Sequence, residues 1–572
     1  MKLARVVEYT DIFPEEEGHE PDIVELVSGI NRKSLVTLTA NMMTRLSGKK
    51  FYDADLIPTA DKVDFIRFFL SWRNPEFIQV VVRRYHLLER RHIDEGRNEP
   101  LLATRPAAVM YFQKVFFSIP PCEDDYTPEM EVRFFKAMLL ANQKVNNSEH
   151  ASDDKLSLDL QVAETCLAYN FANEGIEPSD THDAYRRQMV RFVELVTFLE
   201  RHKRLKPLRE LFRQHYRIGQ IYHYLAPHVI VVHRNKLGAG LHDFKGGNKI
   251  AKVCKRVMER SAIRCDDVIP MDKNADFSAF RAYPTIQLDK HNFAVTSTAF
   301  MLDHIYESMY FQLKQFRLFA GFKNDDEFRT YITTTFTQDW MLNRFMARCV
   351  TSKAKALTEE RCREMVGRKK GIEPPDYYVN EGGNVILFEL KDTLAKARTK
   401  ESRNADEFFA DLRERFYESR KGARKAIKQL MDNVKAIQDG SFVFDDISST
   451  SIVYPVIVVD STYYTQRGVH TKLEYWMRDY CKEIGVNEAC VKPIVLMDIS
   501  TLRLYCRTIK EKGFVYHFEQ YYKDIEWRLN PTLSVLLNAQ KSFSEYMAEN
   551  PVEDINAVCN QVMQACERSW KK

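Results

Sequence analysis

The segment that most constrains the fold spans residues 374–391 and reads PPDYYVNEGGNVILFELK. Its first run, from Asp376 to Val379, is rich in side chains that favour strands. The NEGGN sequence that follows is typical of a tight turn, because two adjacent glycines permit positive φ angles. The second run, VILFELK, is apolar on both faces until its end, as expected for a buried strand. The segment therefore predicts a β-hairpin whose second strand lies inside a sheet.

Three charged residues interrupt this apolar hairpin at one end. Glu389 and Lys391 are two residues apart on the second strand, so their side chains share a face, and Asp376 opens the neighbouring strand. Lone buried charges are costly, so we expect the three side chains to meet. Two carboxylates can hold Mg²⁺, which lowers the pKa of a bound water and neutralises charge on a phosphate. A lysine beside them can stabilise the transition state. The group suits metal-assisted hydrolysis of a phosphodiester.

Pro375-Asp376, followed after twelve residues by Glu389-Leu390-Lys391, resembles the signature of the PD-(D/E)XK nuclease superfamily. The resemblance covers the motif and roughly its surrounding domain. It implies a restriction-endonuclease-like mixed sheet flanked by helices, with Asp376 and Glu389 as ligands of Mg²⁺ or Mn²⁺, Lys391 as the catalytic lysine and DNA as the substrate. The alternative is a surface hairpin in which Glu389 and Lys391 form a cross-strand or solvated pair.

The same resemblance points to two accessory residues. Family members often bring another acid from a helix ahead of the aspartate strand, and Asp339 lies in the helix expected at residues 327–349. Some branches carry a supporting glutamine on the helix after the ExK strand, which here is Gln429 in the helix expected at residues 406–437. Other acids nearer to the motif are Glu359, Glu360 and Glu364.

The chain is expected to be α/β, or α+β overall, in three parts. Residues 1–326 read as a mostly helical region of one or two subdomains, with a regulatory or recognition role. Residues 327–510 form the nuclease-like domain, where the order strand, strand, helix, strand, helix, strand predicts a mixed sheet flanked by helices. Residues 511–572 are expected to be helical. The family usually has one more strand before Asp376, but residues 351–370 are charged and read as helix.

Basic residues follow the hairpin in a polar, loop-like stretch. They are candidates for contact with the DNA backbone, because phosphate contacts are mostly made by lysine and arginine. A mobile charged loop is the equally supported alternative. The residues are Lys396, Arg398, Lys400 and Arg403.

Bulk properties exclude several classes of protein. The 572 residues carry a net charge of only +4, so a nucleic-acid site must be a local patch. Eleven cysteines without a CxxC pair indicate neither a zinc site nor a disulfide framework and favour a reducing cytoplasm. No signal peptide or membrane-length apolar run is visible. The sequence contains no Walker motif, so it gives no sign of a nucleoside triphosphate site.

These observations lead to one main hypothesis, a cytoplasmic, Mg²⁺-dependent endonuclease that cuts DNA. By analogy alone, a large chain with a nuclease core and an extra helical region resembles bacterial restriction or anti-phage effectors. The alternatives are an RNA-cleaving nuclease with the same site and a non-catalytic interaction scaffold with a degenerate nuclease fold. The sequence leaves open a homo-oligomer or a partner subunit.

Overall fold

The expected hairpin is present in the computed structural model of the chain. Its strands are β6 (Tyr377–Glu381) and β7 (Asn384–Lys391), and they pair antiparallel. Gly382 and Gly383 in the turn have φ angles of +63° and +90°, a backbone region that glycine adopts without strain. All of β7 except its first and last residues is buried. The two-sided apolar pattern of this strand therefore places it inside the protein.

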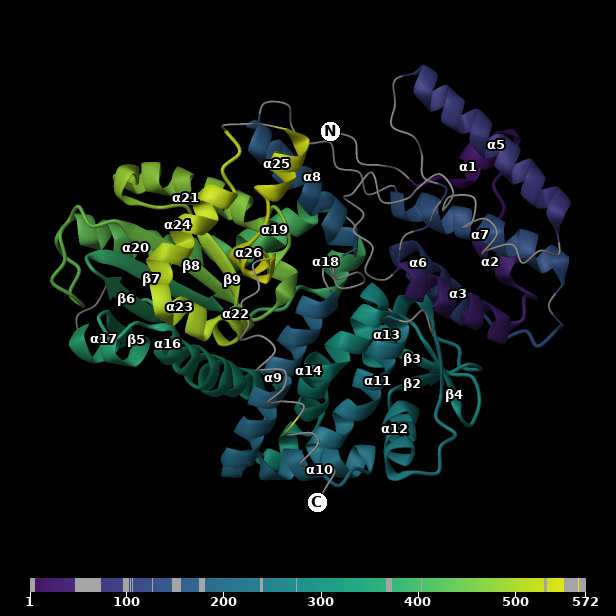
Figure 1. Cartoon of the computed structure of the whole chain (residues 1–572), viewed down its shortest axis with the longest axis horizontal. Coiled ribbons are helices and arrows are strands. Elements are labelled where there is room, and N and C mark those ends of the chain that lie inside the picture. The colour runs from purple at the N-terminus through teal and green to yellow at the C-terminus, as the bar shows by residue number, and fades with distance from the viewer. Residues whose placement is uncertain are drawn as a thin grey trace.

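Figure 1 shows the N-terminal helices at one end of the molecule and the large sheet at the other, with a middle group of helices between them. Among the described residues, no helix is both long enough and apolar enough to cross a membrane. The described part of the chain covers residues 6–46, 74–95, 102–146, 156–173, 181–236, 240–366, 373–528 and 532–549, apart from single positions within them.

The N-terminal helices share one core with a small four-stranded sheet. Fully buried aromatic side chains such as Phe112, Phe116 and Phe134 fill it, and Ile263 and Ile286 of the small sheet join the same core. The sheet has the order β1-β4-β3-β2. The helices are α1 (Tyr9–Ile12), α2 (Ile23–Val27), α3 (Arg32–Leu46), α5 (Pro75–Asp94), α6 (Pro106–Phe117) and α7 (Pro128–Asn146). The strands are β1 (Leu241–Asp243), β2 (Ala262–Arg264), β3 (Thr285–Gln287) and β4 (Asn292–Val295).

The middle helices connect this region to the large sheet. Within this group α9 and α14 pack against each other, and α9 also packs against the helix that follows the last strand of the large sheet. The middle helices are α8 (Leu158–Asn173), α9 (Thr181–Arg201), α10 (Lys206–Tyr216), α11 (Leu225–Lys236), α12 (Lys249–Arg260), α13 (Ser278–Ala282) and α14 (Thr298–Gln315).

The large sheet has five strands in the order β5-β6-β7-β8-β9. β5 (Lys355–Thr358), β6 and β7 pair antiparallel, whereas β7, β8 (Val453–Val459) and β9 (Val495–Asp498) are parallel. The expected mixed sheet flanked by helices is therefore confirmed, and the protein is α+β. Parallel strands run through the centre, so β7 and β8 are covered on both faces.

Each face of the large sheet is covered by a different set of helices. One face, with Leu387 and Ile457, packs under α19 (Ala405–Phe416), α20 (Ala426–Gln438) and α21 (Val469–Ile484). The opposite face, with Phe388 and Val458, belongs to a core that also includes α9, α14 and the C-terminal helices. The remaining helices around this core are α15 (Asp325–Tyr331), η7 (Ile332–Asn343), α16 (Arg344–Cys349), α22 (Ile499–Leu504), α23 (Cys506–Lys512), α24 (Phe514–Asp524) and α26 (Phe543–Glu549). α25 (Leu533–Asn538) instead packs with α8 in a small separate cluster.

The structure differs from the sequence expectation in two local features. Residues 351–370, expected to be helix-like, include the strand β5 before α17 (Glu359–Val366). The sequence pattern did not predict this strand because it has only four residues, none of which is buried. The single helix expected at residues 406–437 is two helices, α19 and α20, separated by nine residues that contain Gly422 at φ +75°.

The C-terminal helices pack back onto the large sheet. The ring of Phe514 at the start of α24 meets that of Phe388 on β7 edge-on, with 5.2 Å between centroids. The backbone amides of Phe514 and Val515 donate to the carboxylate of Glu381 in the hairpin. A single apolar core extends from α9 through the sheet to α26. The division at residue 326 remains a prediction about which parts fold independently.

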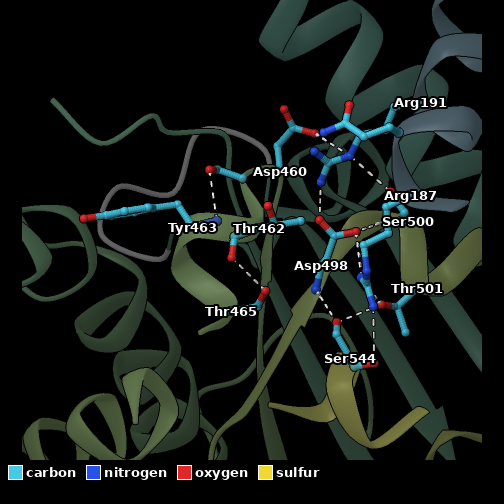
Figure 2. Close-up of polar contacts among 12 residues, drawn as sticks. Arg187, Arg191, Asp460, Thr462, Tyr463, Thr465, Asp498, Ser500, Thr501 and Ser544 are labelled. Atoms are coloured by element: carbon cyan, nitrogen blue, oxygen red, sulfur yellow. Dashed lines mark hydrogen bonds and ion pairs between the residues drawn. The ribbon is translucent and has the colours of Figure 1, made fainter. Parts of the chain in front are cut away.

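A buried ion-pair network fixes α9 to the end of β9 (Figure 2). The carboxylate of Asp498, which is 0% exposed, lies 3.1 Å from the guanidinium of Arg187 and also pairs with Arg191. Arg191 Nε also donates to the Ser500 hydroxyl at 3.1 Å. One buried acid thus holds two arginines of α9, and it also caps α22 by accepting from the Ser500 amide at 2.8 Å.

We expect Asp498→Ala to lower the free energy of unfolding by about 3–5 kcal/mol, because the change leaves Arg191 buried without a close acid and leaves Arg187 with Asp183 alone. Asp479→Ala is a matched control, since Asp479 faces Lys482 at 3.9 Å with both side chains more than half exposed, and an exposed pair contributes at most about 1 kcal/mol. Denaturant unfolding of both variants checks this. Equal, small losses for the two variants would contradict it.

Candidate active site

Asp376 and Glu389 lie side by side at the open end of the hairpin. The pairing of β6 with β7 extends to Tyr377 opposite Phe388, so Asp376, one residue further along, lies beside Glu389. The amide of Leu390 donates a hydrogen bond of 2.6 Å to Asp376 Oδ2. The side chain of Glu389 is only 7% exposed. The hairpin register therefore brings the two predicted metal ligands together.

Lys391 joins this group from the same face of β7. Its Nζ atom lies 2.7 Å from Glu389 Oε1 and donates to Gln429 Oε1 at 3.0 Å. Gln429 reaches the strand from α20, which packs on that face of the sheet. The Lys391 ammonium thus contacts Glu389 and the expected accessory glutamine, and Asp376 lies beside Glu389 on the neighbouring strand.

The electrostatics of the two acids follow from their burial. Burial, and after it the charge of Asp376, raises the pKa of Glu389 from 4.5 to about 8, against the lowering effect of Lys391. Burial also raises the pKa of Asp376 from 3.8 to about 6, although the Leu390 amide and Lys391 oppose this rise. The carboxyl groups of Asp376 and Glu389 therefore lie next to each other in a desolvated position, with Lys391 as the nearby cation. A second cation at this position would favour the ionised form of both acids.

Gln338 and Glu359 complete the polar contacts of Asp376. Gln338 Nε2 donates to Asp376 Oδ1 at 3.3 Å and also to the carboxylate of Glu359. The Glu359 amide donates to the carbonyl of Asp376 at 3.1 Å, which continues the β5–β6 pairing by one residue. Glu359 is one of the nearer acids weighed from the sequence, whereas Gln338 was missed. The helix η7 therefore contacts Asp376 through the side-chain amide of Gln338 and not through a carboxylate.

Asp339, the acid favoured from the sequence, lies on the outer side of this group. It is exposed, and its carboxylate accepts a 3.4 Å hydrogen bond from Asn343. Partial desolvation of its carboxyl group, followed by the charges of Glu360 and Glu359, raises the pKa of Asp339. Asp339 lies in η7, a π-helix, whose wider turn changes which side chains face the sheet relative to an α-helix. This explains why the neighbouring Gln338 contacts Asp376 instead.

The basic residues after the hairpin have different surroundings. Lys396 is half exposed and lies 3.6 Å from Glu414 and 3.8 Å from Asp411. Lys400, in α18 (Ala397–Ser402), is only 17% exposed and forms a 3.0 Å ion pair with Asp276, so little of it is accessible to a phosphate. The side chain of Arg398, and all of Arg403, lie outside the described residues.

The donor set of the site fits a hard divalent cation. Mg²⁺ is commonly held by one or two protein carboxylates and keeps several waters, and Asp376 and Glu389 supply two adjacent carboxylates. Among the described residues there is no group of three or more His, Cys, Asp or Glu side chains arranged to hold a metal. A closed structural zinc site, which needs four protein ligands, is therefore not formed by this part of the chain.

Comparisons with known proteins add no family to this description. The chain matches no protein-family model, and neither the curated proteins nor the solved structures contain a significant match. The resemblance to PD-(D/E)XK nucleases therefore rests on the motif residues of the sequence and stays a prediction.

The raised pKa of Glu389 predicts how stability depends on pH without metal. Between pH 4.5 and about pH 8 the folded protein holds a proton at Glu389 that the unfolded chain has released, so the free energy of unfolding falls as the pH rises through this range. Glu389→Gln keeps an oxygen acceptor for Lys391 and removes the titration. We expect the thermal midpoint, measured in metal-free buffer, to fall less steeply with pH in this variant. Identical slopes would contradict the assignment.

Proposed function

We propose that the protein is a divalent-metal-dependent nuclease that hydrolyses phosphodiester bonds of DNA. The observation that carries the proposal is the meeting of Asp376, Glu389 and Lys391 at the end of a buried strand, with Gln429 on the lysine. Charged side chains are costly to place there, and their types match those needed for metal-assisted attack on a phosphate.

The order of the elements supports the proposal independently of the motif. A helical segment formed by α15, η7 and α16 is followed by β5, the short helix α17, the aspartate strand β6, the ExK strand β7, the helices α18, α19 and α20 and then β8. This is the order expected from the resemblance, including the strand that the sequence did not reveal. Gln429 lies on α20, the third helix after the ExK strand, and some branches of the superfamily carry a glutamine on a helix after that strand.

Each residue has a definite part in the proposed reaction. Asp376 and Glu389 would hold the metal ion, whose chemistry is to lower the pKa of a water and to offset charge on the phosphate. The Leu390 amide orients Asp376 by a hydrogen bond. Lys391 presents its ammonium beside Glu389, where it can orient a water or stabilise the negative charge of the transition state. Gln429 accepts from Lys391 and fixes the direction of that ammonium.

Basic side chains near the site support a polyanionic substrate. α17 begins at Glu359, which contacts the site, and carries Arg361 and Arg363, which pair with Glu364 and Glu359 but keep 70% and 64% of their side chains exposed. Lys396 is 50% exposed on the segment that follows β7. These cations can contact the phosphates on either side of the scissile bond, since most contacts to a nucleic-acid backbone come from lysine and arginine.

Cleavage of a supercoiled plasmid tests the proposal. We expect cutting with Mg²⁺ or Mn²⁺ and none with a chelator. Asp376→Asn and Lys391→Ala should each reduce the rate by roughly 100-fold or more, the typical loss when one group that stabilises the transition state is removed. Asp339→Asn is the matched acidic control and should cut at nearly the wild-type rate, because Asp339 lies outside the group.

Thermal unfolding of each variant separates lost chemistry from lost structure. Folded Asp376→Asn and Lys391→Ala proteins that cut as fast as wild type would remove the proposed active site. Cutting of an RNA of the same sequence, with no cutting of DNA, would assign the same chemistry to the other polymer. If folded wild-type protein with metal cuts neither DNA nor RNA, the alternative of a non-catalytic scaffold is left.

We also propose that the nuclease acts in restriction or in defence against phage. The support is the joining of a large helical region to the nuclease core through α9, which suits a regulated effector. Bacteria that express the chain should reduce phage plating efficiency, and bacteria that express Lys391→Ala at the same level should not. Equal plating on both strains would contradict this role.

A further inference from the structure

The helices α10 and α12 carry a concentration of positive charge that the rest of the chain lacks. Residues 203–217 and 249–260, which contain the two helices, hold eleven lysines and arginines against two acids, Glu210 and Glu259. This excess of nine positive charges is larger than the net charge of +4 of the whole chain, so the remainder of the chain is negative. A site for a polyanion on a chain of this charge has to be a local patch of this kind.

The two helices form one region of the surface. Figure 1 shows α10 and α12 at the lower edge of the middle group of helices, and the two pack against each other. Both turn apolar side chains into the same core, with Phe212 on α10 and Val257 on α12. Burial, and after it the charge of Arg260, lowers the pKa of His215 on α10. The last turns of the two helices are therefore close enough for their charges to interact.

Four cations of α12 form a row along its exposed face. Lys249, Lys252, Arg256 and Arg260 are all exposed, and they are spaced by three, four and four residues, so they lie on one side of the helix. At the rise of an α-helix the row is about 16 Å long. That length corresponds to about five nucleotide steps along one DNA strand. The row can therefore contact several consecutive phosphates.

Most cations of the two helices have no acid beside them. Lys255 lies 3.7 Å from Glu259, and Glu210 pairs with both Arg209 and Arg213. These contacts use both acids. The cations of the two helices that form no ion pair with any residue that the structure describes are Lys206, Arg217, Lys249, Lys252, Arg256 and Arg260.

This placement of charge is unfavourable in the protein alone. Like charges three or four residues apart on a helix repel each other. Lys206 and Lys249 are the first residues of their helices, and neither helix has an acid in its first turn, although the helix dipole favours acids there. A bound polyanion offsets both effects, because it supplies the missing negative charges along the row.

The outward faces of the two helices fit a duplex nucleic acid better than a membrane or a single strand. A helix at a membrane surface inserts a broad apolar face into lipid, but Ile250 is the one exposed large apolar side chain on α10 and α12, both of which are described in full. Single strands are held largely by stacking on aromatic side chains, and Phe212 and Tyr216 of α10 are buried. A duplex backbone needs mainly lysine and arginine.

We propose that the six unpaired cations of α10 and α12 form a surface that binds the sugar-phosphate backbone of duplex DNA without regard to sequence. The choice of DNA rests on the proposed function. The surface supplies affinity for the polymer, whereas the residues around Glu389 carry out the chemistry. Contacts with phosphates carry no sequence information, so two duplexes of unrelated sequence bind equally well.

Fluorescence anisotropy of a short labelled DNA duplex, titrated with full-length protein in a chelator, tests this inference. We expect binding that weakens steeply with salt. Lys252→Gln/Arg256→Gln should bind roughly tenfold or more weakly, and the slope of log Kd against log salt concentration should fall by about 2, because about one counterion is released at each phosphate contact. The matched control Lys482→Gln/Lys523→Gln removes the same charge from exposed positions of α21 and α24 and should bind as wild type does.

Thermal unfolding should show that Lys252→Gln/Arg256→Gln is at least as stable as wild type, because the change removes repulsion along α12. Lys206→Gln/Lys249→Gln is a second variant of the same surface and should lose affinity in the same way. Affinities of the folded variants equal to that of wild type would overturn the inference, as would an equal loss in the matched control. Wild-type protein that binds vesicles of anionic lipid but not DNA would also overturn it.

The chelator separates this inference from the proposed function. Loss of DNA binding in the variants supports the binding surface even if wild-type protein with metal never cuts DNA. Metal-dependent cutting of DNA by wild type, together with unchanged binding by the variants, would overturn the surface and leave the proposed nuclease in place.

Discussion

The contact between the carboxyl group of Glu389 and the ammonium group of Lys391 is the interaction on which the proposed site depends. It lies at the end of the most buried part of the sheet, where an unpaired charge would cost several kcal/mol. The pair alone does not balance the site, because Asp376 adds a second carboxyl at the same position. Replacing the pair by apolar residues would suit the core better. Its presence is therefore better explained by chemistry than by stability.

The architecture around this pair explains how such a group can be held in place. Antiparallel pairing on one side of β7 sets the position of Asp376, and α20 on the covering layer supplies Gln429. Parallel pairing on the other side of β7 places Asp392 and Asp460 at the opposite face of the sheet. The network of Asp498 with Arg187 and Arg191 then ties this edge to α9. The end of β7 thus carries polar side chains on both faces of the sheet, each face bordered by its own apolar core.

The parts of the fold and site that could be predicted are those that depend on residues close together in the sequence. Asp376, Glu389 and Lys391 could be predicted because strand alternation and a glycine turn are local features. Gln338 could not, because the π-helical turn of η7 alters helical spacing, and β5 could not, because a short strand without buried residues carries little pattern. The cavity lined by Arg191, Glu307 and Asp460 could not be predicted either, because these residues are brought together only by the tertiary fold.

Calorimetric titration with Mn²⁺ is the measurement that tests the central claim most directly. If Asp376 and Glu389 share a divalent cation, wild-type protein should bind Mn²⁺ at one site, with tighter binding as the pH rises because ionised carboxylates are required. Glu389→Ala should lose that binding while remaining folded. Absence of saturable Mn²⁺ binding by wild-type protein, or unchanged binding by Glu389→Ala, would contradict the claim.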